Sequence, residues 1–129
     1  MRTSRNPRFG LSLRLVAAGV AVGVLAAACS GPPAPEDAES CEELVTVGVD
    51  WVKRTAEALE GQPLEVVTGD AEPPEEIVEL QAIGAGIDVR ATELGCDPAV
   101  LNAVIGDGVA DLESDDPVVS LFLRLVQSG

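Results

Sequence analysis

The amino-acid sequence predicts a small all-α domain of four helices, and two observations carry this prediction. In four segments, apolar residues recur three and four positions apart, the spacing that gathers them on one face of a helix. Each segment also begins at residues that favour a helix N-terminus, either serine or aspartate as the cap or proline in the first turn. The four segments cover residues 41–60, 74–95, 98–112 and 117–127.

The first predicted helix, residues 41–60, has a clear start and a clear end. Ser40 and Glu43 have the spacing of a capping box, in which two side chains satisfy free backbone N–H groups at the helix start. Gly61 is a residue typical of a helix end. We expect the apolar positions to face the core, with Trp51 as a packing residue; they are Val45, Val49, Val52, Ala56 and Leu59, widened by Leu44 and Trp51.

Residues 61–73 predict a connection, because glycine and proline interrupt this stretch four times. We expect its apolar residues, Leu64, Val66 and Val67, to fold back over the core. A short strand here would have no obvious partner.

The second predicted helix, residues 74–95, has Pro74 in its first turn and two glutamates that complement the positive helix end. Its apolar positions keep a sustained three-four spacing, with a glycine in the middle; they are Ile77, Leu80, Gly84, Ile87, Ala91 and Leu94. This spacing predicts one continuous packing face with a small residue at its middle.

The last two helices, residues 98–112 and 117–127, each follow an Asp-Pro pair, with Asp97 and Asp116 as caps. In the third helix we expect five residues to face inward: Leu101, Val104, Ile105, Val109 and Leu112. The fourth is apolar on nearly all sides, which predicts either a buried central helix or an exposed apolar patch.

The N-terminal residues 1–28 predict a cleaved signal peptide. Residues 1–14 carry four arginines and no acidic residue, and residues 15–28 are fourteen uncharged apolar or small residues. The alternative is a transmembrane helix, which needs about 20 apolar residues. Extending the run upstream meets Arg14, so the signal peptide is the better interpretation.

The end of this segment, Leu25-Ala26-Ala27-Ala28-Cys29, resembles the lipobox of bacterial lipoproteins. The resemblance covers residues 1–29 and implies that Cys29 becomes the first residue of the mature protein and carries a covalent lipid. An ordinary signal peptidase also accepts the pattern of Ala26 and Ala28, and it would release the domain instead. Residues 30–39 are polar and rich in proline, so we expect residues 29–39 to be a flexible tether and residues 40–129 to be the helical domain.

The assignment of Cys29 to lipid leaves two cysteines, Cys41 and Cys96, outside the cytoplasm, where disulfides persist. Cys41 opens the first helix and Cys96 follows the second. If these helices are antiparallel neighbours, the two cysteines lie side by side and form a disulfide. The expected fold is therefore a four-helix domain crosslinked by one disulfide.

The charge of the chain excludes one class of partner. The sequence has 22 acidic and 8 basic residues, which gives a net charge of −14. From Cys29 onward there are 22 acidic and four basic residues, so the net charge of this part is −18. Nucleic acid binding needs clustered lysine and arginine, so we expect no nucleic acid partner. The chain has no histidine, and the acidic run 107–116 lacks the ligand order of a calcium loop. We expect no metal, no cofactor other than the lipid, and no enzymatic activity.

The expected function is that of a lipid-anchored protein on the extracytoplasmic face of the cell membrane that binds another protein of the envelope. The alternative is a carrier or sensor of a small apolar ligand in the helical core. Four glycines lie on the second and third helices, where they either allow close helix crossing or form the floor of a groove; they are Gly84, Gly86, Gly106 and Gly108.

Overall fold

The computed structural model describes residues 33–129, and every regular element in this range is helical. The predicted signal peptide, residues 1–28, and the predicted lipid site at Cys29 lie outside the described residues. Gly31–Gly129 forms a compact unit by itself. Its elements are one 3-10 turn, η2 (Pro35–Asp37), and five helices: α1 (Cys41–Leu59), α2 (Leu64–Thr68), α3 (Glu75–Leu94), α4 (Pro98–Gly108) and α5 (Pro117–Gln127).

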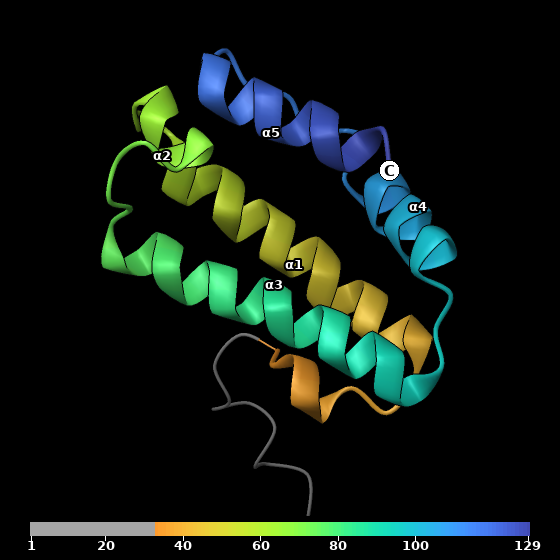
Figure 1. Ribbon diagram of the computed structural model, residues 1–129. Coiled ribbons are helices and arrows are strands. Elements are labelled where there is room, and N and C mark those ends of the chain that lie inside the picture. Colours follow the sequence, from red (N-terminus) through yellow and green to blue (C-terminus); the bar gives the residue numbers. More distant parts are fainter. Residues whose placement is uncertain (1–32) are drawn as a thin grey trace, which may run out of the picture. The chain divides into compact units, whose positions relative to one another are not determined.

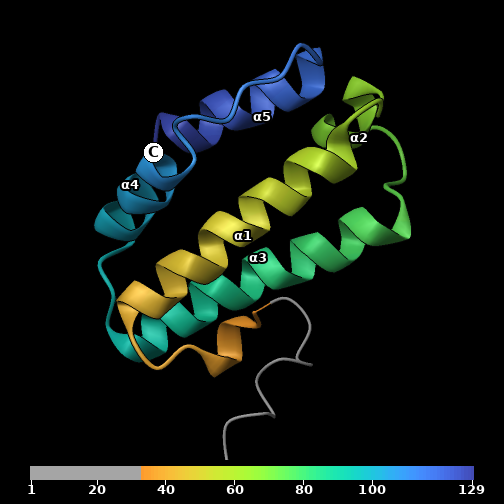
Figure 2. The same ribbon diagram turned by 180° about the vertical axis from the view of Figure 1, so that it is seen from behind.

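The central element of this unit is α1 (Figures 1 and 2). It packs against α3 on one side and against α4 and α5 on the other, and α4 also packs against α5. The turn η2 lies on the side of α3 that faces away from α5. The four longer helices confirm the all-α prediction, and the short α2 is an addition to it.

The helix starts lie where the capping residues predict them. The Ser40 hydroxyl accepts a hydrogen bond from the backbone N–H of Glu43 at 3.2 Å. Asp97 accepts from the N–H groups of Ala99 and Val100 at 2.9 and 3.2 Å. These bonds satisfy donors that a helix leaves free in its first turn. Only the reciprocal half of the capping box differs, because Glu43 accepts from the N–H of Glu39 and not from that of Ser40.

The buried face of α1 is rotated from the predicted one. The buried positions are Leu44, Val47, Gly48, Val52, Thr55 and Leu59. Val45, Val49 and Ala56, which we predicted at the centre of the face, are only partly buried at its edge. The reason is that α1 has neighbours on two sides, so its apolar stripe is broad and its centre is set by where α3, α4 and α5 lie.

Two predictions for the C-terminal helices need correction. The third helix was expected to reach residue 112, but α4 ends at Gly108. Val104, expected inside, is 43% exposed, because the inward face of α4 consists of Leu101 and Ile105. The last helix, α5, is not the central helix: it buries Val118, Val119 and Leu123. Of the two predicted alternatives it fits the exposed apolar patch, because Leu121 and Leu125 are exposed.

The connection between the first two long helices contains a short helix, α2, where we predicted only irregular chain. Of the three residues expected to cover the core, Val66 is buried, whereas Leu64 and Val67 are exposed. Gly69 ends α2 with φ of +84°, a left-handed conformation that glycine adopts without strain.

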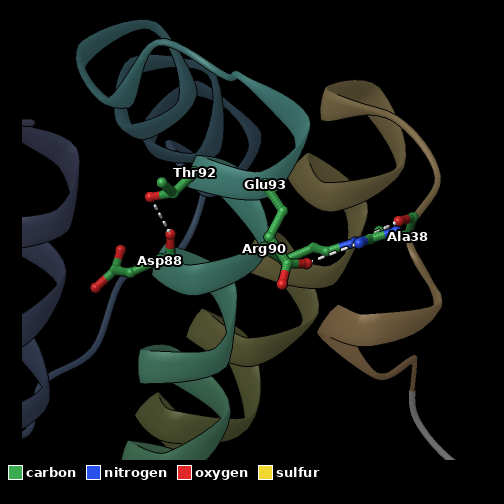
Figure 3. A network of polar contacts seen from close by, with 5 residues as sticks. All are labelled: Ala38, Asp88, Arg90, Thr92 and Glu93. Atoms are coloured by element: carbon green, nitrogen blue, oxygen red, sulfur yellow. Dashed lines mark hydrogen bonds and ion pairs between the residues drawn. The ribbon is translucent and has the colours of Figure 1, made fainter.

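Residues 34–39 form a folded strap on α3, so the prediction of a flexible tether over residues 29–39 is wrong for this part (Figure 3). Pro35 and Ala38 are buried, and the Arg90 guanidinium donates a hydrogen bond from Nε to the Ala38 carbonyl at 2.9 Å. A second donor of Arg90 binds the Glu93 carboxylate at 2.8 Å. The proline-rich composition suggested extended chain, but Pro35 packs against Gly86, which has no side chain to keep it away.

The predicted disulfide between Cys41 and Cys96 is present, with the two Cα atoms 5.8 Å apart. It joins the first residue of α1 to the chain just after α3, as expected for two antiparallel neighbours. The bond closes a covalent loop of 55 residues that contains the two longest helices, α1 and α3.

We expect the double variant Cys41→Ser, Cys96→Ser to lose about 4 kcal/mol of the free energy of unfolding, because the unfolded chain regains the freedom of a loop this long. Urea unfolding of a chain of residues 29–129 with Cys29→Ser measures the loss. Dithiothreitol should destabilise the parent chain by a similar amount and leave the double variant unchanged. A parent chain equally stable with and without reductant would contradict this role.

Asp116 connects the start of α5 to the end of α1. One carboxylate oxygen accepts hydrogen bonds from Val118 and Val119, and the other accepts from the N–H of Gly61 at 3.0 Å. The bond from Gly61, followed by that from Val119, holds the pKa of Asp116 below its ordinary value of 3.8. The charged form is therefore stabilised by folding.

This lowered pKa predicts a pH-dependent effect of Asp116→Asn. The stabilisation from the ionised carboxylate is present above the ordinary pKa of 3.8 and is lost as the pH falls through the lower pKa of the folded state. We expect the parent to have the higher melting temperature above about pH 5 and the gap to shrink below the ordinary pKa. The control is Asp115→Asn, and a gap independent of pH would contradict the prediction.

Candidate functional site

The four glycines singled out in the sequence do not form the floor of one groove. A Cβ on Gly84 would meet Trp51 of α1 at 2.9 Å, and one on Gly86 would meet Pro35 of the strap at 3.3 Å. A Cβ on Gly106 would lie 3.0 Å from the backbone oxygen of Val126 in α5, and one on Gly108 would meet Val49 of α1 at 2.6 Å. Each glycine thus allows a different close approach, and the prediction of a common floor is wrong.

A groove does run between α3 and α5, with α1 beneath it, and it has a volume of about 560 Å³. Trp51 and Val52 of α1 form its floor, and Gln81, Gly84, Ala85 and Asp88 of α3 form one wall. The opposite wall comes from α4 and α5 and includes Ile105, Phe122 and Leu125. We call this site the groove; of the four predicted glycines, only Gly84 lines it.

The aromatic pair Trp51 and Phe122 spans the groove from α1 to α5. The two rings meet edge to face, with centroids 6.1 Å apart. The indole N–H of Trp51 donates to the Leu80 carbonyl at 2.6 Å, so its one polar group is already satisfied. Trp51 is a packing residue, as expected, and Gly84 provides the space for its ring against α3.

The sequence interpretation missed Phe122 and Leu125 as site residues. A signal was present, because Trp51 and Phe122 are the only aromatic residues after Phe9 in the chain. What the sequence did not show is that α5 brings Phe122 against Trp51 across a sequence separation of more than 60 residues.

A second, smaller apolar hollow of about 390 Å³ lies beside the disulfide. Val45 of α1 and Val100 and Val104 of α4 line it, together with both cysteines. It has no aromatic residue, whereas the groove is lined by Trp51 and Phe122.

The acidic residues are spread over the surface of the described domain and are not gathered into a metal site. Within residues 33–129, no group of three or more potential ligands lies close enough to hold a metal ion. Asp116, the acidic residue with the most backbone hydrogen bonds, is used as a helix cap and not as a ligand.

We expect Gly106→Ala to lower the free energy of unfolding by about 1–3 kcal/mol, because the new methyl group would push the α5 backbone away from α4. Helix propensity alone predicts the opposite, a gain of about 1 kcal/mol. Thermal unfolding distinguishes the two results. The matched control is Gly86→Ala, where the new atom meets only the side chain of Pro35 and a smaller loss is expected. A stabilised Gly106→Ala chain would contradict the close approach.

Of the helices within residues 33–129, none has the length and apolar character needed to cross a membrane. No protein-family model, curated protein or solved structure matches the chain.

Proposed function

We propose that the chain is a lipoprotein held at the extracytoplasmic face of the cell membrane by a lipid on Cys29, and that its helical domain binds another envelope protein without catalysing a reaction. The observation that carries the proposal is the order of residues 1–29: a basic segment, an apolar segment and Ala-Ala-Ala-Cys. The disulfide between Cys41 and Cys96 supports it, because such bonds persist in oxidising compartments and are rare in the cytosol.

The cysteine arrangement fits this proposal in a second way. The chain has three cysteines, and two of them are joined in the domain. Cys29 is therefore the cysteine that remains for another chemistry, and it stands directly after the apolar segment. A lipid thioether at this position needs no residue from the folded domain.

The strap shortens the link between anchor and domain. Only residues 30–34 separate Cys29 from Pro35, which is buried on α3. Fully extended, this segment reaches about 20 Å. An anchor on Cys29 would therefore hold the domain close to the membrane surface, even though its net charge of −18 is repelled by anionic lipid headgroups.

A second function, the carriage of a small apolar ligand, is favoured by the size of the groove. Its volume of about 560 Å³ lies within the range of ligand pockets, and its floor is apolar. Binding of a protein segment is our first choice, because the groove is open between two helices and continues into the exposed Leu125 at its rim.

The anchor is tested by expressing the full-length chain and Cys29→Ser in a bacterial host supplied with an alkyne analogue of palmitate. We expect the parent chain to be labelled and to sediment with membranes, and the variant to lose the label. The matched control, Cys41→Ser with Cys96→Ser, also removes thiols and should stay labelled. An unlabelled parent chain would contradict the lipoprotein proposal. The binding role is tested separately, and reproducible crosslinking of the parent chain to one envelope protein on intact cells would support it.

A further inference from the structure

The groove has a wall low enough for another helix to approach closely. On α3, the exposed Ala85 presents only a methyl group, whereas the space beside Gly84 is filled by the Trp51 ring. The groove extends along α3 from Gln81 to Asp88, two helical turns or about 10 Å. Small residues let two helix backbones come near each other, so the groove fits an elongated occupant lying along α3.

The groove also has a charge of one sign. Asp88 is the one charged residue that lines it within the described domain, and no lysine or arginine lines it there. The Thr92 hydroxyl binds the backbone carbonyl of Asp88 and leaves the carboxylate free, and the part of the chain that the structure describes offers that carboxylate no ion pair. Figure 3 shows the Asp88 side chain pointing away from Arg90.

The opposite wall adds no charged side chain, because its lining residues on α4 and α5 are Asn102, Ile105, Phe122, Leu125 and Val126. The exposed apolar side chain of Leu125 stands at this rim, 62% exposed. The groove therefore combines an apolar floor, an apolar rim on α5 and a free carboxylate on α3.

We infer that the groove receives an amphipathic helix of a partner protein, which places apolar side chains on Trp51 and Phe122 and a basic side chain beside Asp88. This inference rests on the proposed binding function and names its surface and the chemistry of its partner. Docking of an amphipathic helix into an apolar groove is a common mode of recognition. The complementary charge favours a basic partner and speeds its association with an acidic domain.

A second copy of the chain is a poor occupant, because two domains that each carry a net charge of −18 repel one another. The groove is also accessible while the strap is docked. Gly86 and Arg90 of α3 contact the strap, and Asp88 lies two positions from each of them. Residues two positions apart on a helix point about 200° apart, in nearly opposite directions. The strap and the groove therefore occupy opposite sides of α3.

Trp51 makes the test direct, because it is the only tryptophan in the chain and lies on the floor of the groove. The chain of residues 29–129 with Cys29→Ser contains the whole compact unit. It is titrated with a tryptophan-free helical peptide of leucine and lysine, about four turns long, and with the same peptide in which glutamate replaces lysine. We expect a saturable change in Trp51 emission with the lysine peptide and none with the glutamate peptide.

Matched variants locate the binding. Leu125→Glu should raise the dissociation constant more than about tenfold, whereas Val100→Glu, an equally exposed change outside the groove, should leave it within about twofold. Asp88→Lys should raise it about fivefold, and Asp107→Lys, with the same change in net charge, should not. Circular dichroism of each variant verifies the helical fold.

Three results would overturn the inference: no change in Trp51 emission, an equal response to the glutamate peptide, or equal losses in Asp88→Lys and Asp107→Lys. A change in emission caused by decanol and not by the lysine peptide would assign the groove to a small apolar ligand instead. Palmitate labelling of Cys29 is independent of all these readings, so the groove inference can fail while the anchored lipoprotein stands.

Discussion

The fold depends on the burial of α1 between two sets of helices. Its neighbours α3, α4 and α5 all pack against it, and α3 packs in addition against the strap. Leu44 and Val52 are fully buried, and Gly48 lets Ile105 of α4 lie directly on the α1 backbone. A substitution that widens α1 at Gly48 would therefore disturb α4, and with it α5. The disulfide fixes the same helix at its first residue, so α1 is held by packing along its length and by a covalent bond at its end.

Local signals in the sequence were sufficient to place the helices, because a cap acts on the backbone of the next three residues. Ser40, Asp97 and Asp116 start their helices where predicted. The rotation of each helix about its own axis was harder to predict. Periodicity shows which residues share a face, but it does not show on which sides several neighbouring helices lie. Val104 kept the spacing of an inward residue and still faces solvent. The strap was missed for a related reason: Pro35 is buried by Gly86, a residue far away in the sequence.

The groove shows the same division between local and distant information. Small residues on α3 were visible in the sequence and correctly suggested close contacts, but the contacts of Gly84, Gly86, Gly106 and Gly108 go to four different places. The groove is made by the meeting of Trp51 and Phe122, which lie on helices at opposite ends of the domain sequence. No pattern within one helix encodes such a meeting, whereas the disulfide was predictable because cysteines have a restricted chemistry.

The strap has a mechanical consequence for a domain anchored through Cys29. A pull on the proposed anchor would reach Pro35 first and load the bond between Arg90 and the Ala38 carbonyl before any long helix. Peeling residues 35–40 from α3 would lengthen the reach by about 20 Å while the helices stay intact. Cys41, covalently joined to Cys96, is the next residue to bear the tension and stops the unravelling there. Under tension the domain would therefore extend by a limited length while its helical core stays folded.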